Sequence, residues 1–193
     1  MEVDEKELLQ CFVRGGPPKA GIEQIIRLYG DGLFGYLMKM SGKRETAEDY
    51  FQETFSRVCE KAGTFRGGNL RAWIFRIATN IVMDGFRKRK RQPMLRLSQI
   101  QDCDGESQIA VAQAKVIHSP SEDAQRQEEK EMVRRIIEEL PAGQRTILVL
   151  SFYQQLSYAE VAEVLNCSVG TVKTQMYRAL KKLADKLPDR DKF

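Results

Sequence analysis

The sequence contains one histidine and four scattered cysteines, so it has few of the imidazole and thiolate groups that bind zinc. Cys11, Cys59, Cys103 and Cys167 show no paired spacing of the kind that binds zinc, and His118 lies in a polar stretch. We therefore expect no metal site and no cofactor. His118 is expected to be an exposed residue of that stretch, so we expect neither a Ser/His/Asp nor a Cys/His catalytic arrangement, and the protein is not expected to be an enzyme. Cys59 and Cys167 are expected to be small residues of the core.

Long hydrophobic runs are also missing. No apolar run approaches the roughly 18 residues that a membrane-spanning helix needs. The first ten residues, MEVDEKELLQ, are acidic and lack the apolar centre of a signal peptide. These two absences predict a cytoplasmic protein without membrane insertion.

The formal net charge is only +4, from 31 basic and 27 acidic side chains, but the charges are unevenly placed. Residues 65–97 carry nine basic groups and one acidic group, whereas residues 98–139 carry five basic and ten acidic groups. Five of these nine cations are consecutive, at Arg87, Lys88, Arg89, Lys90 and Arg91. Such asymmetry indicates a polyanionic partner, although a run of charges also fits a solvated face.

Hydrophobic residues recur with helical spacing in nearly every periodic segment, without sustained strand-like alternation. We expect helices at 21–41, 45–62, 70–89, from about 124 to 140, and after Pro141. Asn69 is expected to cap the third of these helices, after a glycine-rich GTFRGG loop. The turn-rich, acidic stretch 98–124 predicts a linker, with a short helix at 109–117.

These elements predict an all-α fold of two small helical domains joined by a flexible acidic linker. The first domain is expected to span 1–97, the linker 98–124 and the second domain 125–193. In the helix at 45–62, the side chains expected to face inward are Ala47, Tyr50, Phe51, Phe55, Val58 and Cys59. After Pro141, the core candidates are Ile147, Leu148, Leu150 and Phe152.

The most specific motif is LSYAEVAEVLNCSVGTVKTQMYRALKKL, residues 156–183. Ser157 and Glu160 have the spacing of a capping box, and Ser168 can cap a second helix after a tight turn. Two short helices joined in this way predict a helix-turn-helix, whose second helix meets base edges in the major groove. The expected inner face is Val161, Ala162, Leu165, Val169, Val172, Met176, Ala179 or Leu180, and Leu183.

The surface of the second helix offers side chains suited to DNA. Its first turns present Ser168, Gly170, Thr171, Lys173, Thr174 and Gln175. Farther along the helix, Arg178, Lys181 and Lys182 suit phosphates. The same sequence also fits a plain helical hairpin with a solvated cationic end.

The helix expected at 70–89 carries two stripes of side chains. The apolar stripe, expected in the core, is Leu70, Ile74, Ile77 and Ile81. About a quarter turn away lie Trp73, Arg76, Asn80, Asp84 and Arg87. A face that mixes an aromatic ring, cations and an amide suits single-stranded nucleic acid, where bases stack and phosphates meet cations. Trp73 fits equally well at the edge of the core.

Four stretches together resemble a bacterial RNA polymerase sigma factor of the extracytoplasmic-function (ECF) group. They are AEDYFQETF (47–55), FRGGNLRAWIFRIATNIVMD (65–84), the basic tail after it, and LSYAEVAEVLNCSVGTVKTQMYRA (156–179). The resemblance covers nearly the whole chain except 93–125. It implies a subunit that binds core RNA polymerase, directs it to promoter DNA and assists melting in transcription initiation. The family usually has a cognate anti-sigma factor, which is therefore expected as a further partner.

The resemblance also implies roles for individual residues. Core polymerase would be bound by Asp49, Gln52, Glu53 and Phe55. The −10 element would be bound by Phe65, Arg66, Asn69, Trp73, Arg76, Asn80, Asp84 and the five cations from Arg87 to Arg91. The helix-turn-helix would read the −35 element. Two positions depart from the family pattern: Gln175, where a basic residue is frequent, and Gly85, where an apolar helix former is usual.

Three other functions compete with this interpretation. A stand-alone helix-turn-helix regulator would share the second domain but has no use for the AEDYFQETF helix. An RNA-binding regulator would use the surface of residues 65–91 and would not need the second domain. An oxidation-sensing regulator would need cysteines close together, which their spacing does not support.

Overall fold

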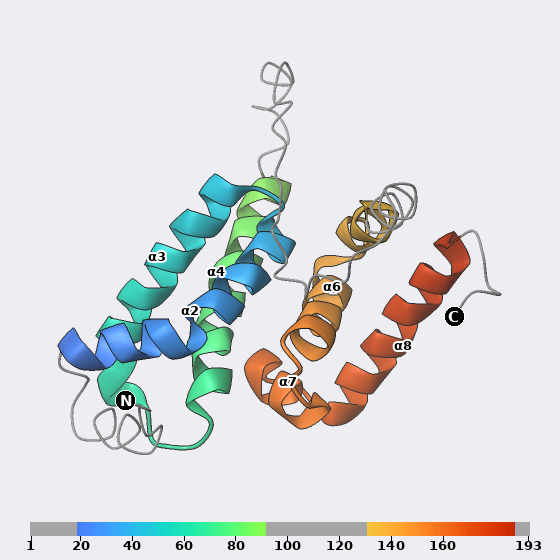
Figure 1. Cartoon of the computed structure of the whole chain (residues 1–193). Coiled ribbons are helices and arrows are strands. Elements are labelled where there is room, and N and C mark those ends of the chain that lie inside the picture. Colours follow the sequence, from blue (N-terminus) through green and yellow to red (C-terminus); the bar gives the residue numbers. More distant parts are fainter. Residues whose placement is uncertain (1–18, 92–130, 188–193) are drawn as a thin grey trace, which may run out of the picture.

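The computed structural model describes residues 19–91 and 131–187, and all regular elements within these two ranges are helices (Figure 1). This part of the chain confirms the expected all-α class. The linker at 98–124, the helix expected at 109–117 and His118 lie outside the described residues. Within the described ranges, no helix is both long and apolar enough to cross a membrane, and no cluster of His, Cys, Asp and Glu could hold a metal ion.

The first helical group consists of α2 (Lys19–Ser41), α3 (Arg44–Lys61), the short 3-10 helix η1 (Ala62–Thr64) and α4 (Leu70–Arg91). Gly42 has a φ of 72°, the left-handed conformation that ends α2. Gly67 and Gly68, at φ 96° and 101°, form the turn before α4. As expected, Asn69 caps α4, because its Oδ1 accepts a hydrogen bond from the N–H of Ala72 at 2.9 Å.

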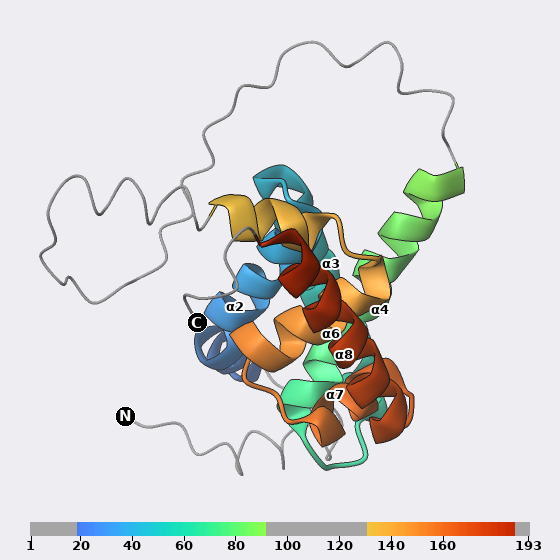
Figure 2. The same cartoon turned by 90° about the vertical axis from the view of Figure 1, so that its right-hand side faces the viewer.

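The second helical group begins with a helical segment at 131–138 and continues with α6 (Ala142–Leu148) and the π-helical turn η2 (Val149–Tyr153). It ends with α7 (Tyr158–Leu165) and α8 (Val169–Lys186). Figure 1 shows α2, α3 and α4 on one side and α6, α7 and α8 on the other. In the turned view of Figure 2, the C-terminal end of α4 extends away from the other helices.

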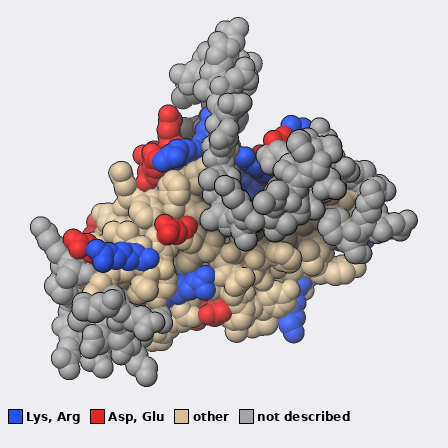
Figure 3. Space-filling view, in the orientation of Figure 1, with Lys and Arg blue, Asp and Glu red and all other residues tan. Residues whose placement is uncertain are grey.

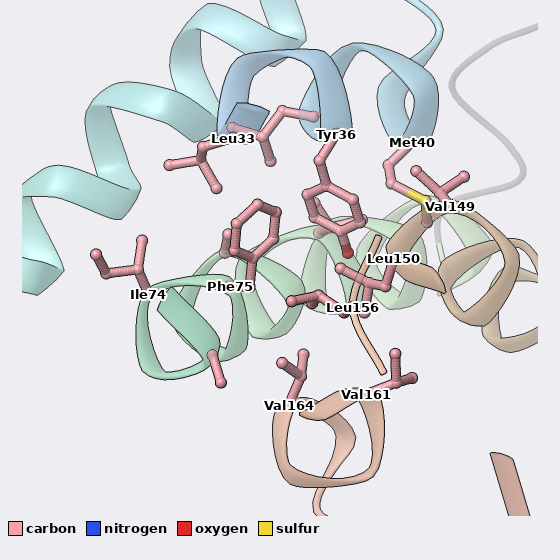
Figure 4. Packing of buried hydrophobic residues seen from close by; sticks show 14 of the residues in the cluster. Leu33, Tyr36, Met40, Ile74, Phe75, Val149, Leu150, Leu156, Val161 and Val164 are labelled. Carbon is pink, nitrogen blue, oxygen red and sulfur yellow. The ribbon is translucent and has the colours of Figure 1, made fainter. Parts of the chain in front are cut away.

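The two helical groups share one continuous hydrophobic core. The apolar stripe of α4 is buried as expected, and α4 packs against both α3 and α7. Figure 4 shows Tyr36 of α2, beside the ring of Phe75 of α4, directed toward Leu150 and Leu156 of the second group, with Val161 of α7 beyond them. All five side chains are at most 2% exposed.

Two expected core residues are instead on the surface. The Phe152 side chain is 74% exposed. It lies in the π-helical turn, where the extra residue per turn rotates later side chains away from the α-helical face. Cys59 is exposed on α3, and Cys167 is half-buried. The predictions of a core position for Phe152 and Cys59 are therefore wrong.

Gly85 provides room for a side chain of α3. A Cβ atom on Gly85 would lie 1.9 Å from the hydroxyl oxygen of Tyr50 and 2.9 Å from its Cζ. Tyr50 is partly buried and packs against the hydrophobic core. The glycine that departs from the family pattern is thus a position where the Tyr50 side chain of α3 occupies the space that a Cβ atom on α4 would need.

Replacing Gly85 tests this contact. We expect Gly85→Ala to lower the free energy of unfolding by about 1–3 kcal/mol, because the added methyl group must displace Tyr50. When Tyr50 is already replaced by alanine, Gly85→Ala should instead raise the free energy of unfolding by about 1 kcal/mol, since alanine is a better helix former than glycine. Urea unfolding of the four proteins measures both effects. An equal effect in the two backgrounds would contradict the contact.

Candidate nucleic-acid interface

The helix-turn-helix is built by hydrogen bonds that its own sequence supplies. At the start of α7, the Ser157 hydroxyl accepts from the Glu160 N–H at 3.3 Å, and the Glu160 carboxylate accepts from the Ser157 N–H at 2.8 Å. Asn166 ends α7 in the left-handed conformation, with φ 51°. The Ser168 hydroxyl then accepts from the Thr171 N–H at 3.1 Å and begins α8. The expected capping box and second cap are confirmed.

The inner face of this motif is narrower than expected. Val172, Met176 and Ala179 of α8 are buried, as are Val161 and Ala162 of α7. The inner-face position that the sequence left open between Ala179 and Leu180 is occupied by Ala179, which is fully buried. Leu180 and Val169 are 46% and 39% exposed, so the inner position expected for Val169 is wrong. Val169 lies in the first turn of α8, next to its cap, where the chain has just left the turn.

The outer surface of α8 carries the expected DNA-facing residues. Eight of these residues are exposed to solvent: Ser168, Gly170, Thr171, Lys173, Thr174, Arg178, Lys181 and Lys182. The Thr174 hydroxyl donates to the Gly170 carbonyl at 2.9 Å, which orients its methyl group. Gln175 differs from the others, because it is half-buried and its Oε1 accepts from Gln144 of α6 at 3.3 Å. The expected base contact of Gln175 therefore competes with packing against α6.

The second stripe of α4 forms a separate outer surface. Arg76, Asn80 and Arg87 are exposed, whereas Trp73 is half-buried and its ring lies 5.4 Å from the ring of Phe65. Phe65 itself is only 4% exposed. In this structure the Phe65 ring is part of the core beneath Trp73, so it supports the outer stripe from within and does not lie on its surface. Arg66 is exposed in the loop before α4.

The basic end of α4 has internal partners. Asp84 accepts from Arg87 at 2.7 Å in an exposed pair, so this carboxylate neutralises a cation. An ion pair this exposed contributes little to stability, so a DNA phosphate can compete with Asp84 for Arg87. The guanidinium of Arg89 lies 4.7 Å from the centre of the Phe86 ring, and Lys88 is exposed. The side chains of Lys90 and Arg91 lie outside the described residues. The face in Figure 3 shows only scattered charges on a mostly uncharged surface.

The exposed face of α3 offers a third surface. Asp49, Gln52 and Glu53 are exposed, and Glu53 pairs with Arg57 at 2.6 Å. Phe55 is 7% exposed and its ring lies 4.8 Å from the ring of Phe51. The inward position expected for Phe55 is confirmed, and this ring packs into the core of the first group and holds α3 in place, so it does not lie on the exposed face beside Asp49, Gln52 and Glu53.

Glu160 plays a part that the sequence does not reveal. Besides its role in the capping box, its Oε1 accepts from Nδ2 of Asn69 at 2.7 Å, across the boundary between the two helical groups. Hydrogen bonds from the backbone N–H and the hydroxyl of Ser157 lower the pKa of Glu160, with smaller contributions from Asn69 and Arg71. The carboxylate is thus held ionised next to the loop before α4.

The fold and these surfaces define a helical DNA-binding protein with a helix-turn-helix and a second group of helices. Residues 25–92 match the family description Sigma-70 region 2, and residues 130–183 match Sigma-70, region 4. The chain is 33% identical to the ECF RNA polymerase sigma factor EcfG of Rhodopseudomonas palustris, over 79% of this chain and 77% of that protein. It is 31% identical to the ECF sigma factor SigW of Bacillus subtilis, over 86% of this chain and 88% of that protein.

A solved structure has the same fold. The sigma factor RpoE in complex with the anti-sigma factor NepR from Bartonella quintana superimposes with a TM-score of 0.66 at 26% identity, over 87% of this chain and 98% of that chain. The chain belongs to the ECF group of RNA polymerase sigma factors, which confirms the resemblance seen in the sequence. It is a factor that directs RNA polymerase to promoters. Sigma factors are non-catalytic transcription initiation factors.

Proposed function

We propose that this sigma factor divides its work among three surfaces. The exposed carboxylates and amide of α3 bind core polymerase, the outer stripe of α4 with the loop before it binds and opens the −10 element, and α8 reads the −35 element. The observation that carries the proposal is the separation of these surfaces. Residues 49–53 of α3, residues 76–88 of α4 and residues 170–182 of α8 each present exposed polar side chains on a different helix.

The proposed surfaces lie in two domains of the chain, with α3 and α4 in the first and α8 in the second. We place the first domain at 1–97, the linker at 98–124 and the second domain at 125–193, in agreement with the two matched ranges. The chain acts in the cytoplasm by binding alone and catalyses no reaction. An anti-sigma factor is its further partner, by analogy with the RpoE–NepR complex.

Transcription with core polymerase on a library of promoter fragments tests the function. We expect a subset of fragments, sharing two separated elements, to be transcribed only when this protein is added. A stand-alone regulator would instead select duplex fragments without polymerase, and an RNA-binding regulator would prefer RNA over DNA. Either of these two outcomes would contradict the proposal.

Alanine substitutions in α8 should separate base contacts from phosphate contacts. Thr171→Ala or Lys173→Ala should cost about 1–3 kcal/mol in binding and relax the preference at one or two base pairs. Arg178→Ala should weaken binding to all sequences alike, because a phosphate contact carries no sequence information. Selection from a randomised −35 element measures both effects. A uniform loss for every variant would remove the base-reading role of α8.

A further inference from the structure

A pair of glutamines joins α6 to the DNA-facing helix α8. The two helices pack against each other, and Nε2 of Gln144 donates to Oε1 of Gln175 at 3.3 Å across their contact. Gln144 is only 9% exposed, whereas Gln175 is half-buried at the edge of the outer surface of α8. The oxygen end of the Gln175 amide is therefore directed inward, toward α6.

The burial of Gln144 fixes the direction of this hydrogen bond. Oε1 of Gln144 is buried and has no hydrogen-bond partner among the described residues. If both amides were reversed, the N–H2 group of Gln144 would lack an acceptor instead. A buried N–H group without a partner is rarer in proteins than an under-satisfied C=O group. Gln144 is therefore the donor of the pair, and Gln175 is the acceptor.

The nitrogen end of the Gln175 amide is available to a ligand. In the part of the chain that the structure describes, this Nε2 atom donates to no protein group and is not one of the buried polar atoms without a partner, so it is accessible to solvent. Thr171 and Arg178 lie four residues before and three residues after Gln175, on the same side of α8, and both are exposed. The N–H2 group of Gln175 thus lies beside side chains that the proposed function assigns to DNA.

We propose that Gln144 is a positioning residue that restricts Gln175 to hydrogen-bond acceptors on the base edges of the −35 element. This inference rests on the proposed function, in which α8 reads that element. A free glutamine amide recognises adenine with both of its ends, because its oxygen accepts from N6 and its N–H2 group donates to N7. With its oxygen directed to Gln144, the Gln175 amide offers only donors to DNA. Such donors suit O6 and N7 of guanine or O4 of thymine.

The same pairing gives a physical reason for the departure from the family pattern at position 175. A lysine or arginine, which is frequent there, also offers donors and no acceptor. Gln175 held by Gln144 therefore keeps the hydrogen-bonding character of a basic residue without its charge. Gln175→Lys should accordingly preserve the base preference of the unsubstituted chain.

Gln144→Met tests the proposal in the holoenzyme assembled from core polymerase and the full chain. Methionine is unbranched and of similar length, so it keeps the packing of α6 while it releases Oε1 of Gln175. The urea midpoint of the free variant should not fall, because the change also removes the unpaired buried oxygen of Gln144. Selection from promoters with a randomised −35 element then measures the base preference at those base pairs where Gln175→Ala relaxes it.

We expect Gln144→Met to enrich adenine, on either strand, about fivefold at those base pairs, because the released amide can contact adenine with both ends. In the double variant Q144M/Q175K this enrichment should be absent, since lysine has no acceptor to release. Gln154→Met is the matched control. It makes the same change at another buried glutamine, which follows η2 rather than facing α8, and it should leave the base preference unchanged.

Three results would overturn the proposal. They are an unchanged base preference in Gln144→Met, adenine enrichment that persists in Q144M/Q175K, and a loss of binding in Gln175→Ala that is equal for all sequences. The last result would mean that Gln175 contacts phosphate, which carries no sequence information. Failure of the proposed function is a different outcome, because the unsubstituted holoenzyme would then select no −35 sequence. Failure of the present inference would leave that selection intact.

Discussion

Replacing Asp49, Gln52 and Glu53 together with alanine should reduce the affinity for core polymerase by at least about a hundredfold. All three side chains are exposed on one helix, and none of them fills the core. At a protein interface, a few well-placed residues carry most of the binding energy, about 2 kcal/mol or more each. Loss of the Glu53–Arg57 pair should cost little stability, because it is a surface ion pair whose two side chains are 35% and 45% exposed.

The measurement is a binding titration with labelled core polymerase, accompanied by circular dichroism and thermal unfolding of the free variant. The matched control is the double variant Glu23→Ala, Asp31→Ala. It removes two negative charges, as the triple variant does, but from exposed positions on α2. We expect the control to bind normally. If the triple variant still binds and supports transcription, α3 is not the docking surface.

Neutralising the basic end of α4 should produce the second large effect, a flatter salt dependence of DNA binding. If the protein makes about four phosphate contacts, the logarithm of its binding constant should fall with the logarithm of salt concentration with a slope of about −3.6. A fourfold rise in salt then lowers the affinity roughly a hundredfold. Replacing Lys88, Arg89 and Lys90 with glutamine should bring the slope close to about −1 for every duplex sequence. Titrations at four salt concentrations measure it.

Asn80→Ala should leave that slope nearly unchanged and impair strand opening instead. Asn80 is exposed on the outer stripe, so its removal leaves the core intact. Trp73→Ala is a poorer probe, because Trp73 packs on the buried ring of Phe65 and its loss would disturb the fold. Permanganate-reactive thymines report opening, and a pre-melted template should partly rescue Asn80→Ala. Equal rescue of the neutralised variant would contradict this division between phosphate and base contacts.

Much of the local structure was predictable because its causes are local. The apolar stripe of α4, the cap at Asn69, the capping box of Ser157 and Glu160, and the cap at Ser168 depend on groups within a few residues of one another. Helical periodicity and cap chemistry act at that range. For the same reason, the helix-turn-helix and the exposed polar residues of its second helix could be predicted from the sequence.

The burial of a side chain could not be predicted from the sequence where an element distant in the chain covers or exposes it. Phe55 and Phe65 lie in the core because other aromatic rings pack on them, and Phe152 is exposed because a π-helical turn shifts the register. A periodic pattern shows that a face is apolar, but it does not show which neighbour arrives to cover it.

The sequence by itself determined the helices, their caps, the DNA-binding motif and the family. Only the tertiary structure decided that the two helical groups close on one core and that Asn69 bonds to Glu160, 91 residues away. The physical reason is range: hydrogen bonds within a helix are set by neighbours, whereas contacts across 91 residues depend on where the whole chain places its apolar surfaces.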